Sequence, residues 1–186
     1  VPITPDEAFE VDASVESMSL ERATYDECVE YICQNLEKAT EYLYSTRPSD
    51  EILIPTRGAA LATLSRVLLY AASPWFNGGS GGYYSDWVRK SDGAHFISQT
   101  KDNQKWGKAA IAAKRVMNTE LYQLYTSKRK SDTGQLSEAA LKAYAARPIS
   151  QFDPLEIDPF RSYAEVFNGD IPAEVNEEII YSCRPT

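Results

Sequence analysis

The sequence predicts an all-α fold, built of helical hairpins that long ordered loops connect. Two observations carry this expectation: an amphipathic stripe of apolar residues over 24–44, and a helix over 57–72 that is apolar nearly all round and rich in alanine. The chain has 186 residues, which is about one domain and is long enough to bury a core. We therefore expect residues 1–186 to form a single α-helical segment.

The first helix has a clear beginning. Thr24 and Glu27 match a capping box, in which each side chain accepts a hydrogen bond from the other residue's backbone N–H. Apolar residues then recur at alternating steps of four and three, and we expect the helix to end near Tyr44, ahead of Pro48. The stripe consists of Tyr25, Val29, Ile32, Leu36, Ala39 and Leu43. Residues 4–22 are polar and acidic, and predict an extended surface segment.

The second helix is expected over residues 57–72. Thr56 can cap it, and Pro74 cannot continue it because proline has no N–H to donate. The alanines let neighbouring helices approach closely, while larger apolar side chains fill the gaps between them. We expect the helices to bury one cluster together, composed of Leu61, Leu64, Val67, Leu68, Ile32, Leu36 and Trp106.

A third helix is expected over about residues 104–118, with Asp102 or Asn103 as its cap. One face of this helix holds Trp106, Ala109 or Ala110, Ala113 and Met117. Trp106 stands among alanines, so we expect it in the core. Weaker helical patterns cover residues 137–146 and 160–168, and only residues 178–182 look like a strand.

Two connections are longer than helix packing requires, over residues 74–101 and 126–159. Loops of more than about 12 to 15 residues are usually functional or disordered. The first connection is too hydrophobic for a disordered linker, so we expect an ordered surface loop. Its aromatic residues are Trp75, Phe76, Tyr83, Tyr84, Trp87 and Phe96.

The charge of the chain excludes some partners. It has 19 basic and 27 acidic residues, for a net charge of −8, and only residues 128–130 form a basic run, so a nucleic-acid partner is not expected. No apolar run approaches the ~20 residues that span a bilayer. The three cysteines are too few for a disulfide framework. Cys28 and Cys33 lie five residues apart on one predicted helix, and we expect buried or half-buried thiols.

The common catalytic constellations are absent from the sequence. His95 is the only histidine, which excludes a two-histidine zinc site, and there is no Gly-x-Ser-x-Gly elbow, P-loop or Cys-x-x-Cys. The glycines at 78, 79, 81 and 82 follow a helix instead of opening one, which does not favour a phosphate cradle. We therefore expect none of these chemistries in the segment, and no cofactor.

The carboxylates in the long connections leave two alternatives open. Glycoside hydrolysis needs only a facing pair of carboxyl groups, and calcium is bound by carboxylate and carbonyl oxygens, although no EF-hand spacing is present. The simpler interpretation is solvation and turn capping, with Asp153-Pro154 and Asp158-Pro159 as turn initiators. The carboxylates concerned are Asp86, Asp92, Asp153, Glu156 and Asp158.

The aromatic loop favours carbohydrate binding. The apolar C–H face of a sugar ring packs on a flat aromatic side chain, while the hydroxyl groups need polar partners at its edge. The candidate rings for contact with a sugar are Tyr83, Tyr84 and Trp87. The alternative is that these rings pack into the scaffold. The candidate polar partners close by in the sequence are Asn77, Asp86 and Arg89.

Several short motifs together resemble those of the SusD/RagB family. The alanine-rich helix ends in Ala72-Ser73-Pro74-Trp75-Phe76-Asn77, as it does in that family. The other landmarks follow in the family's order along essentially the whole chain. They are Val1-Pro2-Ile3, Arg22 to Glu27, Trp106 to Met117, Tyr122 to Tyr125, Ser162 to Phe167 and Asn176 to Ser182.

The resemblance implies a SusD-like fold of tetratricopeptide-like helix pairs, in which Trp75 and Phe76 pack against the scaffold. It also implies a non-enzymatic, surface-exposed lipoprotein of a Gram-negative outer membrane. Such a protein binds an oligosaccharide or polysaccharide for uptake through a SusC-like TonB-dependent transporter, its partner. In the family Val-Pro-Ile lies well inside a longer protein, so we expect N- and C-terminal parts, including the lipid anchor to the membrane, to lie outside this segment.

Two alternatives to glycan binding follow from the same residues. A stack of helical hairpins can hold a peptide or a protein on its concave face, and some SusD-like proteins are known to capture peptides. Glycan binding would depend on the aromatic loop, whereas a protein-binding scaffold would depend on exposed residues of the helices. A glycoside hydrolase is the third possibility.

Overall fold

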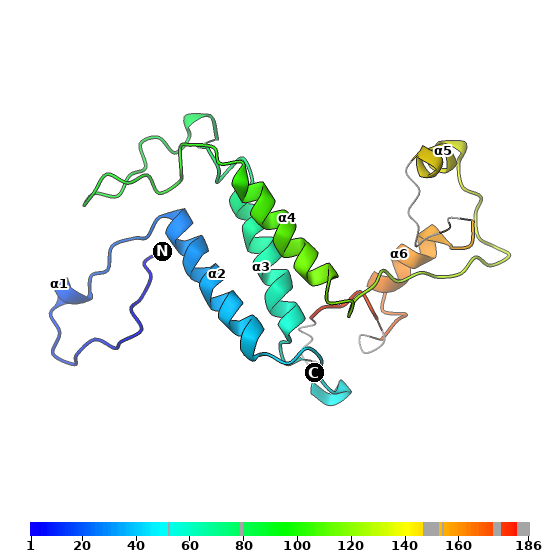
Figure 1. Ribbon diagram of the computed structural model, residues 1–186, viewed down its shortest axis with the longest axis horizontal. Helices are drawn as coiled ribbons and strands as arrows, with labels where there is room; N and C mark the ends of the chain where they lie inside the picture. The colour runs from blue at the N-terminus through cyan, green and yellow to red at the C-terminus, as the bar shows by residue number, and fades with distance from the viewer. Residues whose placement is uncertain (52, 79, 147–152, 154, 173–175, 182–186) are drawn as a thin grey trace. The chain divides into compact units, whose positions relative to one another are not determined.

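The computed structural model describes residues 1–51, 53–78, 80–146, 153, 155–172 and 176–181 (Figure 1). Over these residues the structure is helical and contains no strand, which confirms the all-α prediction. The chain divides into two compact units. Unit 1 comprises Val1–Arg47 and Ile54–Thr119, and unit 2 comprises Pro48–Leu53 and Glu120–Thr186.

Helix α2, Tyr25–Tyr42, begins with the predicted capping box. The Thr24 hydroxyl accepts from the Glu27 N–H at 3.2 Å, and the Glu27 carboxylate accepts from the Thr24 N–H at 2.7 Å. A shorter helix, α1 (Val15–Met18), precedes it where the sequence predicted an extended segment. One turn of helix is too short to show an apolar periodicity, so this element was missed.

Helix α3, Arg57–Ala72, forms the centre of unit 1 and packs against both α2 and α4. Thr56 caps it as predicted, and it ends before Pro74, with Ser73 as the C-cap residue. Its small residues bring the neighbouring helices close, and Leu64 is only 1% exposed. Its buried residues are Gly58, Ala59, Ala60, Leu61, Leu64, Ala71 and Ala72.

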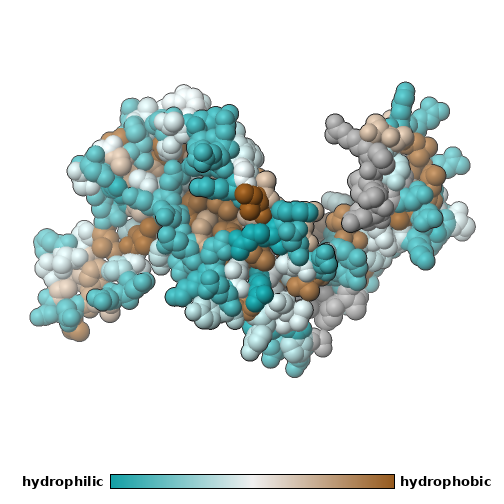
Figure 2. Space-filling model, viewed as in Figure 1, coloured by the Kyte–Doolittle hydropathy of each residue, from teal (hydrophilic) through white to brown (hydrophobic). Residues whose placement is uncertain are grey.

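Helix α4, Gln104–Met117, packs against α3 through Ala109 and Ala112, and not through Trp106. Trp106 is 44% exposed, so its predicted place in the core is wrong. Alanine at both contact positions brings the two helices close together, and the face that includes Trp106 and Met117 lies beside this contact. Figure 2 shows hydrophobic residues of the described chain at the surface among hydrophilic ones.

The rest of the predicted cluster is buried to different degrees. Leu61 and Leu64 are buried as expected, whereas Leu36 is half-buried and Ile32 is 41% exposed. Val67 and Leu68 of α3 are also half-buried. Among the helices of the described residues, α2 packs on α3 alone, so helices cover its apolar stripe on one side only. The prediction for Ile32 was therefore wrong.

Helices α2 and α4 run in the same direction, with α3 antiparallel to both (Figure 1). Lys105 and Asp26, near the beginnings of α4 and α2, form an ion pair at 2.6 Å. Arg115 and Glu37, farther along the same two helices, form a second pair with 2.8 Å between Nη2 and Oε2. The two ion pairs thus link side chains of α2 and α4, which each pack on α3.

Unit 2 contains the short helix η1 (Ser49–Glu51) and the helices α5 (Glu138–Ala146) and α6 (Pro159–Phe167), the last two at the predicted places. The predicted strand is absent over residues 178–181, and Ser182 lies outside the described residues. The Ile179 N–H donates to the Asn176 carbonyl in a turn. A strand needs a continuous partner, and within the described part of the chain one backbone bond links this region to another segment, from the Gln123 N–H to the Glu177 carbonyl.

Candidate functional site

The loop between α3 and α4, which the sequence predicted to be an ordered surface loop, is tied to the beginning of α2. The Tyr25 N–H donates to the Phe96 carbonyl at 2.8 Å. The Phe76 ring stacks on the Tyr25 ring with 4.4 Å between centroids and an interplanar angle of 10°. Phe76 therefore packs against the scaffold, as the family resemblance implied.

Asn77 fixes the two ends of this loop to each other. Its side chain is 4% exposed, its amide nitrogen donates to the Asp102 carbonyl at 2.8 Å, and its oxygen accepts from the Asp102 N–H at 2.7 Å. The amide thus holds the chain five residues after the end of α3 against the chain two residues before α4. Of the polar residues that the sequence suggested for ligand contact, Asn77 is the one whose side chain lies inside the scaffold.

Residues 87–96 form a small hairpin that brings two aromatic rings together. The Phe96 N–H donates to the Trp87 carbonyl at 3.0 Å, and an antiparallel bridge joins Val88 to His95. Gly93 makes the turn with a φ of +73°, a conformation that residues with a Cβ rarely adopt. The Trp87 and Phe96 rings consequently lie 5.1 Å apart, tilted by 49°.

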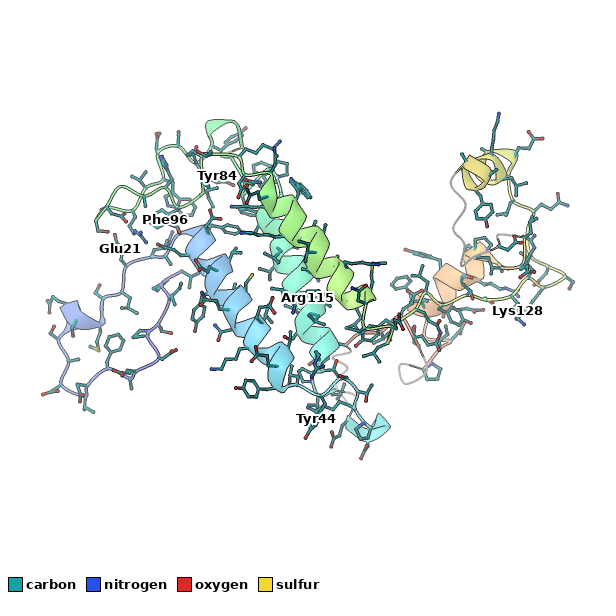
Figure 3. The ribbon with its side chains drawn as sticks, in the orientation of Figure 1. Glu21, Tyr44, Tyr84, Phe96, Arg115 and Lys128 are labelled. Atoms are coloured by element: carbon teal, nitrogen blue, oxygen red, sulfur yellow. The ribbon has the colours of Figure 1, made fainter. Side chains whose placement is uncertain are left out.

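This cluster includes a cation and a third ring. The Tyr84 ring lies 6.3 Å from Trp87, and the Arg22 guanidinium lies 5.6 Å from the Trp87 centroid and 5.8 Å from the Phe96 centroid. Tyr84 and Phe96 are labelled in Figure 3. Trp87 keeps 43% of its surface exposed, and Tyr84 is half-buried. The structure therefore brings together Tyr84 and Trp87 of the predicted site.

A second aromatic pair consists of Trp75 and Tyr83. Their ring centroids are 6.2 Å apart, and the residues are 55% and 79% exposed. The implied packing of Trp75 against the scaffold is therefore wrong, because Phe76 occupies the position against Tyr25 and its neighbour in the chain faces solvent. Two large, open rings side by side form the most exposed aromatic surface of the loop.

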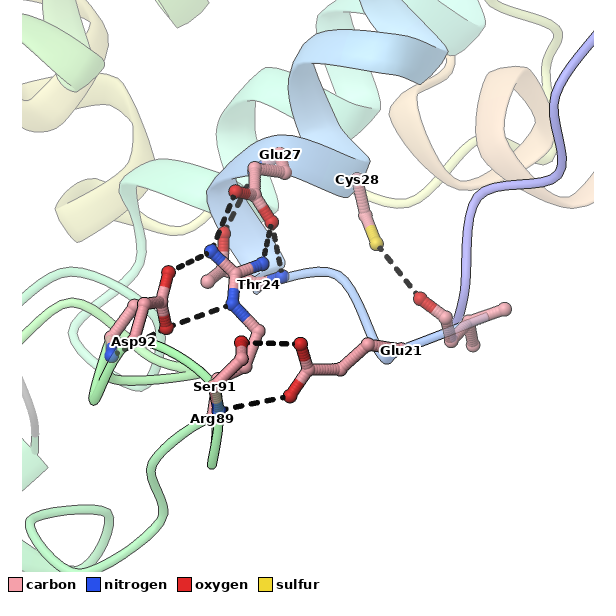
Figure 4. A network of polar contacts seen from close by, with 9 residues as sticks. Glu21, Thr24, Glu27, Cys28, Arg89, Ser91 and Asp92 are labelled. Atoms are coloured by element: carbon pink, nitrogen blue, oxygen red, sulfur yellow. Dashed lines mark hydrogen bonds and ion pairs between the residues drawn. The ribbon is translucent and has the colours of Figure 1, made fainter. Parts of the chain in front are cut away.

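Arg89 lies between two carboxylates instead of facing open solvent (Figure 4). Its Nη1 donates to Glu27 at 2.9 Å, and its Nε and Nη2 donate to Asp92 at 3.0 and 2.7 Å. These hydrogen bonds lower the pKa of Asp92 to about 2, lower the pKa of Glu27 and raise the pKa of Arg89. The Arg89 guanidinium is already occupied, with its side chain 18% exposed.

Glu21, in the segment just before α2, contacts the hairpin of residues 87–96 at Ser91. The Glu21 carboxylate accepts from the Ser91 N–H at 3.3 Å and also from the Ser91 hydroxyl (Figure 4). Three contacts thus join this region to the hairpin. Glu21 accepts hydrogen bonds, the Arg22 cation lies over the aromatic rings, and Glu27 forms an ion pair with Arg89. None of these contacts was predicted, because each joins positions about 60 or more residues apart in the chain.

Asp86 is the remaining polar residue of the predicted site. It is exposed and accepts a hydrogen bond from the Ser85 hydroxyl at 3.3 Å. It follows Tyr84 and precedes Trp87 in the chain, so it lies at the edge of the aromatic cluster. A carboxylate there has oxygen atoms that can accept hydrogen bonds from the hydroxyl groups of a sugar.

Asp153 and Asp158, two more carboxylates of the long connections, have local partners. Asp153 accepts from the Leu155 N–H at 2.8 Å, and Asp158 caps α6 by accepting from the Arg161 N–H at 2.9 Å, so both have the predicted turn and cap roles. The Arg161 N–H lowers the pKa of Asp158. Among the described residues, no three His, Cys, Asp or Glu side chains are grouped as metal ligands.

A groove of about 280 Å³ lies between α2 and α3 on the surface of unit 1. It is mainly apolar, and Cys28, one of its lining residues, is a free, half-buried thiol as predicted; so is Cys33. The groove is lined by Tyr25, Cys28, Val29, Ile32, Thr63, Arg66, Val67 and Tyr70.

Residues 1–69 match a SusD-like family that is described as starch-binding and associating with outer membrane. No curated protein matches the chain. Among the helices of the described residues, none is long and apolar enough to cross a membrane.

The fold is similar to solved structures of BT4246, a SusD-like protein. One of them superposes with a TM-score of 0.64 at 22% identity, covering 100% of this chain and 31% of that one. A selenomethionine form gives a TM-score of 0.53 at 25% identity, covering 76% of this chain and 25% of that one. The chain thus spans about a third of the length of the relative that it matches, and its likeness to the SusD-like family is carried by the match over residues 1–69 and by the fold.

Proposed function

We propose that the chain contributes to glycan binding at the cell surface, through the aromatic loop between α3 and α4. The observation that carries the proposal is the pair of exposed rings of Trp75 and Tyr83, held on an ordered loop beside the Trp87 cluster. Exposed aromatic rings on a rigid support offer flat apolar surfaces to the C–H faces of sugar rings. The family's description as starch-binding supports the same ligand class.

Within this proposal, the candidate residues have two roles. Trp75, Tyr83, Tyr84 and Trp87 provide the rings, and Asp86 provides hydrogen-bond acceptors at the edge. Asn77 and Arg89 act through the loop, because their polar atoms are bonded to the protein itself. The protein binds an oligosaccharide or polysaccharide and does not cleave it.

The family context extends the proposal to transport. The description of the family as associating with outer membrane supports a surface location. We infer a surface lipoprotein that passes its glycan to a SusC-like TonB-dependent transporter for uptake. Co-purification of such a transporter with the protein from outer membranes is the direct test of this partner.

A second candidate function is supported by the apolar groove between α2 and α3. A groove of about 280 Å³ lined by Val29, Ile32 and Val67 can take apolar side chains of a peptide. In that case the substitution Ile32→Asp abolishes binding and the aromatic loop is dispensable. The exposed rings of the loop favour a glycan ligand, since rings this exposed contribute little to packing.

Retardation in native gels that contain soluble starch tests the glycan proposal. Tyr83→Ala removes an exposed ring of the loop, and Tyr42→Ala removes a ring of equal exposure from α2, at 79% and 76%. We expect Tyr83→Ala to reduce retardation, and Tyr42→Ala to leave it unchanged. Equal retardation of both variants by a starch that binds the unmodified protein would show that the loop is not the site.

A further inference from the structure

One carboxylate joins the beginning of α2 to the aromatic hairpin. Oε2 of Glu27 accepts both from the Thr24 N–H, at 2.7 Å, and from Arg89 Nη1, at 2.9 Å, while Oε1 accepts from Arg89 Nη2 at 3.2 Å (Figure 4). The capping box fixes this carboxylate on the first turn of the helix. The Glu27 carboxylate is therefore bonded both to the helix cap and to the Arg89 side chain.

Arg89 in turn determines the geometry of the hairpin. Its backbone pairs with Ala94, through the Arg89 N–H and the Ala94 carbonyl at 2.8 Å, and its side chain holds Asp92 within the turn. Asp92 also accepts from the Ala94 N–H at 3.0 Å. Trp87 lies two residues before Arg89 on the same hairpin arm, and its carbonyl accepts the next backbone bond, from Phe96.

We propose that Glu27 is a positioning residue for the carbohydrate-binding loop: through Arg89 it sets the orientation of the Trp87 ring without touching the ligand. This inference rests on the proposed glycan function. It predicts that breaking the Glu27–Arg89 pair leaves the helices intact and weakens glycan binding. The ion pair works as a fixed spacer between α2 and the ring cluster, and not as a major source of stability, since Glu27 is 45% exposed.

The substitution Glu27→Gln separates the two tasks of the side chain. Glutamine keeps the oxygen that accepts from the Thr24 N–H, since either Glu or Gln completes a capping box, but it loses the charge that holds Arg89. Glu37→Gln is the matched control, because it breaks the similarly exposed ion pair with Arg115 in the same unit, away from the loop. Arg89→Lys is the second variant, since lysine keeps a charge but not the forked contact with two carboxylates.

Fluorine NMR of the full chain labelled with 5-fluorotryptophan reads the ring directly. The chain has three tryptophans, and the Trp87 signal is assigned by its loss in Trp87→Phe. We expect Glu27→Gln and Arg89→Lys to shift or broaden the Trp87 signal, while Glu37→Gln leaves it in place. An unchanged Trp87 signal in both Glu27→Gln and Arg89→Lys would overturn the inference, whatever the glycan affinity of these variants.

Affinity gels with increasing soluble starch supply the second readout. We expect the apparent Kd of Glu27→Gln to rise about fivefold, in keeping with loss of one aligned stacking contact, with a melting temperature equal to that of Glu37→Gln. A Trp87 signal that moves while the Kd stays constant also overturns the positioning role. If the unmodified protein binds no glycan, the proposed function fails, and the NMR signal alone decides whether Glu27 orients Trp87.

Discussion

Arg115 of α4 donates both arms of its guanidinium to the carboxylate of Glu37 on α2, with 2.8 Å between Nη2 and Oε2. The contact joins two helices that are separated in sequence by the whole of α3 and the aromatic loop. It lies away from the Asp26–Lys105 pair at the beginnings of the same helices. Both pairs link side chains of α2 and α4, which each pack on α3.

A double-mutant cycle of Glu37→Gln and Arg115→Gln measures this contact. The side chains are 46% and 38% exposed, so water and salt weaken the attraction. We expect a coupling free energy of about 0.2 to 1 kcal/mol in urea unfolding, reduced in 1 M salt. A coupling of about 3 kcal/mol would show that the pair is far more desolvated than its exposure indicates.

The substitution Leu64→Ala tests the core. Leu64 is 1% exposed at the centre of α3, and its removal leaves a cavity among closely packed alanines. We expect the free energy of unfolding to fall by about 2 to 5 kcal/mol in urea titration. The control is Leu69→Ala in the same helix, which is 52% exposed and should cost less than about 1 kcal/mol. Equal losses for the two variants would contradict the assignment of Leu64 to the core.

Acid should break the ion pairs that Arg89 forms with Asp92 and Glu27. The pKa of Asp92 is about 2 in the folded protein, below its ordinary value of 3.8, so its contribution is complete above pH ~4 and is lost as the pH falls through about 2. The hydrogen bond from Arg89 lowers the pKa of Glu27 as well. We expect tryptophan fluorescence to change within this window, and the change to shrink in Asp92→Asn. A fluorescence step between pH 5 and 7 instead would point to another group.

The apolar face of α4 should cause self-association of a polypeptide that consists of residues 1–186 alone. Trp106 and Met117 are 44% and 67% exposed on this face, and exposed apolar patches tend to find partners. We expect sedimentation velocity to show dimers or larger species that the double substitution Trp106→Glu, Met117→Glu converts to monomers. A monomer at all concentrations without the substitutions would contradict the prediction.

The sequence predicted what depends on neighbours along the chain. The caps at Thr24 and Thr56 and the stop before Pro74 are local, and the structure confirms them. The phase of α4 was wrong by about one residue, since alanines at 109, 110, 112 and 113 leave no apolar contrast between its faces. The contacts of the site could not be predicted from the sequence, because Glu27 and Arg89 are 62 residues apart and no pattern along the chain links them.

Calorimetric titration with soluble starch tests the central claim, that the aromatic loop binds glycan. Trp75→Ala removes a ring of the loop that is 55% exposed, and Trp106→Ala removes one from α4 that is 44% exposed, so the two variants are matched in chemistry. We expect Trp75→Ala to weaken binding by about 1 kcal/mol, roughly fivefold in Kd, and Trp106→Ala to leave the Kd unchanged. An unchanged Kd in Trp75→Ala, or weaker binding in Trp106→Ala alone, would contradict the account.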